Sequence, residues 1–111
     1  MEKLKFILKS EEETIINREE SYYIKDNVIK FKIDSIIFEY DIDNDKLIKK
    51  DENILIMDFK NNNFIITLKE NNLSFDIPIL EVIIKKSKNN INIRYMIEEN
   101  KMVNKCINIE Y

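Results

Sequence analysis

The residue pattern with the clearest chemical meaning is a run of acidic residues in the segment 41–52. Carboxylates stand at positions one, three, five and twelve of this segment, namely Asp41, Asp43, Asp45 and Glu52. This is the ligand spacing of an EF-hand calcium loop, and the aliphatic Ile48 also fits. However, Lys46 stands where the loop needs Gly for its sharp turn, and the flanking residues alternate as in strands. Calcium binding and a solvated acidic hairpin tip therefore stay open as interpretations.

Other carboxylates are candidates for acid–base catalysis, which needs two such groups on either side of a substrate. The candidate pairs are Glu39 with Asp41 and Asp58 with Asp76. The sequence places neither pair in a pocket, and solvated strand faces are the simpler interpretation. The acidic run at residues 11–13 is predicted to be a solvated loop after the first strand.

Nucleophilic and metal chemistry is limited by the residues that the sequence lacks. Cys106 is the only cysteine, and there is no His and no Gly. A catalytic cysteine is normally activated by a histidine, so we predict that Cys106 is a half-buried strand residue. Zinc clusters of imidazole and thiolate, glycine loops for phosphate and nucleophile elbows are excluded by composition. We therefore predict a non-catalytic protein with no cofactor, no metal and no catalytic residue.

Charge and aromatic residues bear on the partners of the protein. The formal net charge is −3 and no basic stripe is visible, so neither nucleic acid nor a membrane surface is an expected partner. Phe31 lies between Lys30 and Lys32, and the alternation predicts a core ring with two exposed lysines. Two roles stay open for the tyrosines, which either line a ligand cavity or lie at the core boundary with solvated hydroxyls. They are Tyr22, Tyr23, Tyr40, Tyr95 and Tyr111.

Length and composition predict one globular domain that spans residues 1–111. The first six residues lack the apolar segment of a signal peptide. No apolar run approaches the roughly 20 residues that a membrane-spanning helix needs. A single cysteine cannot form an internal disulfide, so we expect a cytoplasmic protein.

The elements that must position these residues are short strands. Turn-forming Asp and Asn residues recur along the chain, at residues 26–27, 43–45, 51–53, 61–63, 71–72, 89–90 and 98–100. Both residue types tolerate the positive φ that tight hairpins require, a task usually given to Gly. Apolar and polar residues alternate between the turns, as in the segments 4–8 and 91–97. A period of two predicts strands with one buried face.

The hairpin at residues 26–27 allows a register prediction. If these two residues form the loop, Ile24 faces Ile29. Tyr22 then faces Phe31 on the same side of the sheet, so both apolar rows agree with the turn. A slip of one residue would break this agreement.

A two-residue loop at residues 89–90 likewise places Val82 and Ile84 on the face of Ile93 and Tyr95. The weakest strand in the prediction is the segment 79–86, where a short helix after the only proline is the alternative. Its β-branched residues favour the strand.

The predicted fold is an all-β, antiparallel, meandering β-barrel of about 8 to 10 short strands. Short turns link consecutive strands, which favours a meander. About eight strands suffice to close a small barrel, and closure removes exposed edges.

Three stretches also resemble a known family. They are residues 3–13, residues 21–31, and the tail of residues 91–97 and 103–109. Their strand patterns resemble the YwiB-like family of bacterial proteins, a domain of unknown function with a calycin-like, lipocalin-like β-barrel. The chain is shorter than the family pattern in its middle and lacks the glycines and threonines of the central strands. The resemblance implies a calycin-type barrel and carries over no functional residue.

Two functional hypotheses follow from this fold. The first is a non-catalytic barrel that holds a small apolar ligand among inward-facing Ile, Phe and Tyr side chains. The alternative is a protein-interaction module or homodimer that uses a strand edge or a surface patch. No binding residue can be named from the sequence for either hypothesis.

Overall fold

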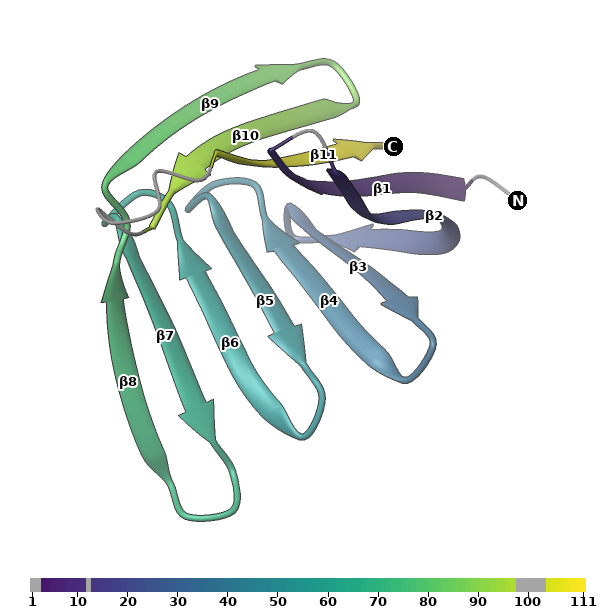
Figure 1. Ribbon diagram of the computed structural model, residues 1–111. Coiled ribbons are helices and arrows are strands. Elements are labelled where there is room, and N and C mark those ends of the chain that lie inside the picture. Colours follow the sequence, from purple (N-terminus) through teal and green to yellow (C-terminus); the bar gives the residue numbers. More distant parts are fainter. Residues whose placement is uncertain (1–2, 12, 98–103) are drawn as a thin grey trace. The chain divides into compact units, whose positions relative to one another are not determined.

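The computed structural model describes residues 3–11, 13–97 and 104–111. All regular secondary structure in these residues is β-strand, and none of it is helical. Eleven strands follow one another in this part of the chain (Figure 1): β1 (Lys3–Ser10), β2 (Glu13–Lys25), β3 (Val28–Ile33), β4 (Ile36–Asp41), β5 (Lys46–Lys50), β6 (Asn53–Asp58), β7 (Asn63–Leu68), β8 (Leu73–Pro78), β9 (Glu81–Ser87), β10 (Asn90–Met96) and β11 (Lys105–Glu110). Every paired neighbour is antiparallel. The predicted all-β antiparallel meander is therefore confirmed, and the arrangement is consistent with the β-barrel class.

The structure has one strand more than the upper limit of the prediction. The additional element is β5, which lies inside the segment that the sequence assigned to an acidic loop. Leu47 is the only buried residue of β5, and three of its five residues are lysines. Such a strand has almost no apolar alternation, so the period-two signal is absent there.

No helix that could cross a membrane occurs among the residues that the structure describes.

The chain divides into two compact units, each described here by itself. Unit 1 comprises Met1–Ser21 and Ile79–Tyr111, and unit 2 comprises Tyr22–Pro78. In unit 1 the strands lie in the order β9-β10-β11-β1-β2, so the two ends of the chain pair with each other. In unit 2 the last residues of β2 pair with β3, and the order continues without crossover to β8. The prediction of a single domain stays a prediction.

One face of the unit 1 sheet is buried and apolar. Its central side chains are at most 3% exposed, and they are Leu4, Phe6, Ile91, Ile93, Tyr95, Ile107 and Ile109. The register places them side by side, since Phe6 pairs with Ile109 and Ile93 with Ile107. The residues between them, such as Lys9, Asn92 and Cys106, point to the opposite face.

Unit 2 buries one face of its first strands. Phe31 of β3 stacks on Phe38 of β4, with ring centroids 5.2 Å apart and planes 4° from parallel. Ile29 and Tyr40 are fully buried. Towards β8 the burial of this face declines, because Phe64 of β7 is 5% exposed while Phe75 of β8 is 48% exposed.

The turns use Asp and Asn in place of Gly. Among the described residues, eight have positive φ, and all except Glu11 are Asp or Asn: Glu11, Asp26, Asn27, Asp34, Asp45, Asn62, Asn72 and Asn89. Short polar side chains lower the cost of the left-handed region. The predicted substitution for Gly is therefore confirmed. The predicted turn at residues 98–100 lies outside the described residues.

The two register predictions have different outcomes. The hairpin at residues 26–27 pairs Tyr22 with Phe31 and Ile24 with Ile29, as predicted. The second hairpin turns at residues 88–89, one residue earlier than predicted, because Asn90 already pairs with Ser87. The shift moves the pairing by an even number of residues, so Val82 and Ile84 stay on the predicted face.

The segment 79–86 is not a helix. Residues Glu81–Ser87 form β9, which confirms the strand interpretation. The helical alternative would have turned Leu80 and Ile83 inward, but they are 44% and 49% exposed.

Candidate functional site

The segment 41–52 does not form an EF-hand loop. Residues Lys46–Lys50 are a strand that pairs with both β4 and β6. Because this strand separates them, Glu52 lies at the opposite end of β5 from Asp41. Asp41 instead accepts hydrogen bonds from the backbone N–H groups of Asp43 (3.1 Å) and Asn44 (3.2 Å) and from the Asn44 amide (2.9 Å). Bonds of this kind define a compact acidic turn.

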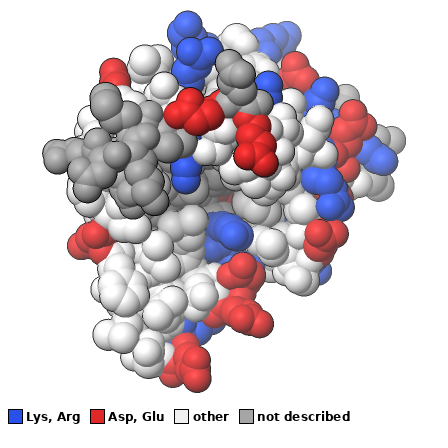
Figure 2. All heavy atoms as spheres, in the orientation of Figure 1, with Lys and Arg blue, Asp and Glu red and all other residues white. Residues whose placement is uncertain are grey.

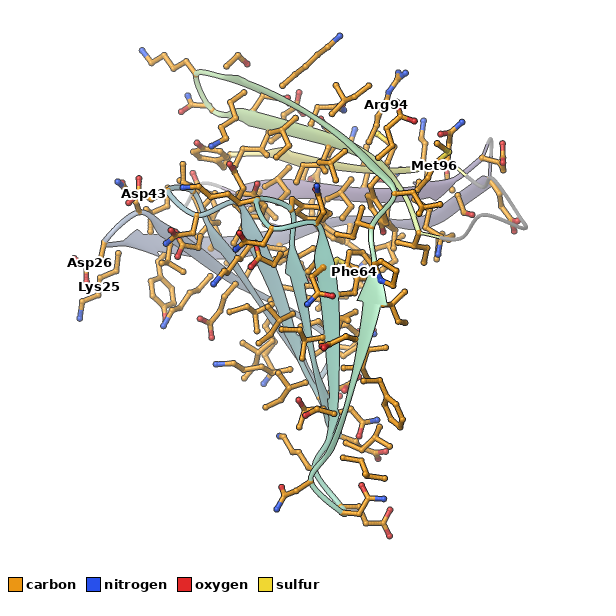
Figure 3. All side chains as sticks on the ribbon, turned by 90° about the vertical axis from the view of Figure 1, so that its left-hand side faces the viewer. Lys25, Asp26, Asp43, Phe64, Arg94 and Met96 are labelled. Carbon is orange, nitrogen blue, oxygen red and sulfur yellow. The ribbon has the colours of Figure 1, made fainter. Side chains whose placement is uncertain are left out.

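The turn is tied to the neighbouring hairpin. The Asn27 amide donates to the carboxylate of Asp43 at 3.3 Å, and the Ile42 N–H donates to the Asn27 carbonyl at 2.9 Å. Figure 3 shows Asp43 beside the hairpin that carries Lys25 and Asp26. Within the described residues, no three His, Cys, Asp or Glu side chains cluster closely enough to hold a metal ion.

The predicted carboxylate pairs have separate partners. Lys50 donates to Glu39 at 2.7 Å, whereas Asp41 belongs to the turn. Asp58 accepts hydrogen bonds from Asn61 and lies 3.9 Å from the Lys46 ammonium. Asp76 is exposed on β8 and pairs with Ile65 instead. Neither pair presents two carboxylates to one substrate.

The remaining acidic and aromatic candidates lie where the simpler interpretations placed them. Glu11 and Glu13 are exposed, and Glu12 lies outside the described residues. Phe31 is buried as predicted, and Lys32 is exposed, but Lys30 is half-buried, so only one of the two lysines is as exposed as expected.

The tyrosines do not gather at one place. Tyr40 is fully buried and its hydroxyl donates to Asp45 at 3.1 Å. Tyr95 is 3% exposed, and burial raises its pKa above the usual range of a phenol. Tyr23 is 58% exposed, while Tyr22 and Tyr111 are half-buried. These environments are typical of a core and its boundary.

Charges of both signs are interspersed on the face of the molecule in Figure 2, where no large patch of one sign is visible. Lys46 and Asp58, Lys49 and Asp51, and Lys50 and Glu39 form ion pairs on unit 2. A site for a charged ligand must therefore come from a local group of unpaired charges.

Such a group lies on the polar face of unit 1, around a hollow of about 840 Å³. The side chains that line it come from β1, β9, β10 and β11 and from the residues beside them. They include Ile7, Lys9, Glu11, Glu81, Ile83, Asn92, Arg94, Met96, Lys105, Cys106 and Asn108. Arg94 and Met96 of β10 are labelled in Figure 3. The volume lies within the range of about 300–1,000 Å³ that is usual for small-molecule sites.

Cross-strand pairing sets the order of the groups in the hollow. Cys106 of β11 pairs with Lys9 of β1 on one side and with Arg94 of β10 on the other. Arg94 in turn pairs with Ile83 of β9. The thiol therefore lies between two cations, with an exposed isoleucine at the end of the row.

The next row contributes two amides. Asn92 donates its side-chain N–H groups to Asn108 Oδ1 at 3.3 Å and to Cys106 Sγ at 3.6 Å. These contacts fix the Asn92 amide and turn the Asn108 NH₂ group away from it. Among the described residues, the Asn108 NH₂ group has no hydrogen-bond acceptor.

Lys9 differs from another lysine on the same face of the same strand. Lys5 pairs with Glu19 of β2 and Glu110 of β11, so carboxylates flank it on both sides. Lys9 pairs with Thr14 and Cys106, neither of which is a carboxylate. The positive charge at this end of β1 is therefore not compensated by its cross-strand neighbours.

A second candidate surface is the end strand of unit 2. β8 pairs with β7 alone among the described strands. Leu73 and Phe75 are 50% and 48% exposed, and they continue the apolar row of Ile66 and Leu68 on β7. This edge presents unpaired backbone groups beside apolar side chains.

Sequence reasoning identified Cys106 as half-buried, which the structure confirms, but it missed Lys9, Asn92 and Arg94 as its neighbours. The alternation of polar and apolar residues in the sequence does predict that each of them lies on a polar face. The pairing of β1 with β11 joins residues about a hundred positions apart, and no local pattern reports it.

Comparison with known proteins gives no family. No family model, no curated protein and no solved structure matches the chain.

Proposed function

We propose that this protein is a non-catalytic interaction module that forms a homodimer by pairing β8 of one copy with β8 of another. The observation that carries the proposal is the exposed apolar edge of unit 2. β8 ends its sheet, and the two large side chains Leu73 and Phe75 are each about half exposed. An exposed edge of this kind adds a strand from another chain readily.

The other end strand is protected, which explains why β8 is the docking edge. β9 carries Lys85 and Lys86 in its second half, and lysines on an edge oppose strand addition. β8 has no lysine, and Asp76 is its only charged residue. Its proline, Pro78, is the last residue of the strand, so it limits the pairing without preventing it.

The sequence of β8 favours its own copy as the partner. A two-fold axis at Phe75 sets Phe75 opposite itself and Leu73 opposite Ile77 of the second copy. In this pairing, odd-numbered residues of one copy lie opposite odd-numbered residues of the other. The apolar rows of both copies therefore share one face of the sheet. Asp76 lies opposite Ser74 of the second copy, so no like charges meet.

Neighbouring registers are worse. An axis at Asp76 sets two carboxylates opposite each other, which is destabilising. An axis at Ser74 requires Asn72 to be extended, whereas its φ is 54° in the turn. A pairing shifted by one residue sets apolar side chains against polar ones. The turn at Asn72 and the proline at Pro78 thus confine the pairing to residues 73–77.

The prediction of a small apolar ligand has less support. A carrier needs unfilled space beside its inward-facing side chains. Eight large apolar side chains are less than 2% exposed, so almost none of their surface borders water-sized space: Leu4, Phe6, Ile29, Tyr40, Ile91, Ile93, Ile107 and Ile109. The ligand hypothesis, the cytoplasmic location and the resemblance to the YwiB-like family stay predictions.

Native mass spectrometry of the purified chain tests the proposal, because it reports assembly and bound mass together. We expect a bare dimer whose population grows with protein concentration. Phe75→Lys should abolish it, since the two-fold axis would bring two ammonium groups together. Ile83→Lys on β9 is the matched control, as Ile83 is equally exposed, and it should leave the dimer intact.

A mixing experiment tests the register. In a Cys106→Ser background, Ser74→Cys and Asp76→Cys chains should form a disulfide with each other much faster than either forms with itself. A monomer at every concentration would contradict the dimer, as would equal effects of Phe75→Lys and Ile83→Lys. Extra mass on a monomer would favour the apolar-ligand prediction instead.

A further inference from the structure

We infer that the hollow on unit 1 binds a small organic monoanion through a carboxylate held between Lys9 and Arg94. The two side chains flank Cys106 on adjacent strands, so their backbones lie about 10 Å apart, two strand spacings. A single carboxylate above the thiol lies within reach of both. Among the residues that the structure describes, neither side chain forms a hydrogen bond or an ion pair.

The chemistry of the two cations fits a carboxylate. The Arg94 guanidinium offers a planar pair of donors that matches a carboxylate in bidentate fashion, and Lys9 adds a point charge. The Asn108 NH₂ group supplies a further donor on the next row, since its oxygen is occupied by Asn92.

The charge of the lining selects a monoanion. Three cations, Lys9, Arg94 and Lys105, and two carboxylates, Glu11 and Glu81, line the hollow, which leaves a net charge of +1. A dianion such as phosphate carries one negative charge more than the lining compensates, and this excess charge would repel Glu11 and Glu81. A single carboxylate placed at the row of Cys106 avoids this repulsion.

The remaining lining describes the body of the ligand. Ile83 is 49% exposed beside Arg94, and Ile7 and Met96 also line the hollow. These side chains give an apolar body a surface to cover, and the burial contributes about 25 cal/mol for each Å² removed from water. The ligand class is therefore a carboxylic acid with a compact apolar body.

Cys106 reports on this site because it is the only thiol of the chain. Its thiolate displaces iodide from iodoacetate or iodoacetamide and forms one carbon–sulfur bond in each case. The two reagents differ in charge, so the ratio of their rates measures the local positive potential. Differences in intrinsic reactivity cancel when variants are compared with the unmodified sequence.

We expect the ratio of iodoacetate to iodoacetamide rates to fall severalfold in Lys9→Gln and in Arg94→Gln. Lys5→Gln is the control, since it removes the same charge from the same face of β1 but outside the hollow. At physiological salt the Debye length is about 8 Å, so distant charges contribute little. Circular dichroism confirms that each variant is folded.

Benzoate provides the binding test, with the neutral benzamide as its control at equal ionic strength. Benzoate should slow alkylation of Cys106 by iodoacetamide, benzamide should not, and Arg94→Gln should reduce the protection by benzoate. Equal protection by both compounds would show an apolar site without anion selectivity and overturn the inference. So would an unchanged rate ratio in Lys9→Gln and Arg94→Gln.

Discussion

The end strands of the two units, β9 in unit 1 and β8 in unit 2, differ in the charge and hydrophobicity of their side chains. β9 carries Lys85 and Lys86, and its exposed Ile83 borders a polar hollow. β8 carries one charge, Asp76, and a row of apolar side chains. The lysines of β9 oppose the addition of another strand, whereas the apolar side chains of β8 favour it.

The same contrast extends to the faces behind the edges. In unit 1 a fully buried apolar face backs a face of amides and uncompensated cations. In unit 2 the apolar face continues to the edge and becomes exposed at Leu73 and Phe75. The two proposals therefore concern different parts of the chain: a small organic anion on unit 1 and a second protein surface on unit 2.

The largest expected difference between the core and the edge of unit 2 is in the free energy of unfolding. It concerns two phenylalanines, one on β7 and one on β8, that lie on the same face of the sheet. Phe64 is 5% exposed and contacts the Phe59 ring edge-on at a centroid distance of 6.1 Å, so Phe64→Ala should cost about 3–5 kcal/mol. Phe75→Ala should cost about 1 kcal/mol or less, since only cross-strand contacts are lost. Urea unfolding at low protein concentration, where the dimer is dissociated, measures both.

Equal losses would mean that Phe75 belongs to the core and that β8 is not a docking edge. A Phe75→Ala chain that keeps its stability but no longer dimerises separates binding from folding. Phe64→Leu is the control for ring loss at the buried position, and we expect it to be milder than Phe64→Ala because it leaves a smaller cavity.

An intermediate effect concerns the turns that attach each edge strand to its neighbour. Asn72 precedes β8 with φ of 54°, and Asn89 follows β9 with φ of 66°. Asn→Ala at either position should cost about 1 kcal/mol, because a Cβ without a polar group is disfavoured in the left-handed region. Asn→Gly should be close to neutral.

Thermal unfolding of the four variants checks this prediction, and each Gly variant is the control for its Ala variant. A loss as large in Asn→Gly as in Asn→Ala would show that the amide, not the backbone angle, matters. A larger loss at Asn89 than at Asn72 would indicate that the Tyr111 N–H bond to the Asn89 carbonyl, 2.9 Å long, depends on the turn.

The sequence was sufficient for the strands and for one register because local patterns encode them. Alternation predicts which residues share a face, and the loop at residues 26–27 fixes the pairing of Tyr22 with Phe31. The loop at residues 88–89 was misplaced by one residue because two adjacent asparagines compete for the turn. β5 was missed since its lysines hide the alternation.

The candidate surfaces were not predictable for a different reason. Leu73, Phe75 and Ile77 alternate like the residues of any core strand, and periodicity does not report whether a strand has a second neighbour. Lys9 and Lys5 look equivalent in sequence, yet only Lys5 has carboxylates on both adjacent strands. Long-range pairing decides both properties.

The smallest expected effect compares two turns of unit 2 by their pH dependence. The Asn44 amide donates to Asp41 and lowers the pKa of that carboxyl below its ordinary value of 3.8, helped by backbone N–H groups and by Lys46 against the opposing effect of burial. A lowered folded-state pKa contributes stability that is present above the unfolded pKa and is lost as the pH falls through the folded one. Asn44→Ala should therefore reduce the free energy of unfolding at about pH 6, and the difference should shrink towards about pH 2.

In the turn before β8, Asn71 accepts the Leu73 N–H through a neutral amide at 3.3 Å, so the effect of Asn71→Ala should not change over the same range. Urea titrations of both variants at several pH values decide the matter. A parallel pH dependence in the two variants would mean that Asp41 draws no stability from its charge and that the acidic turn acts only through the shape of its backbone.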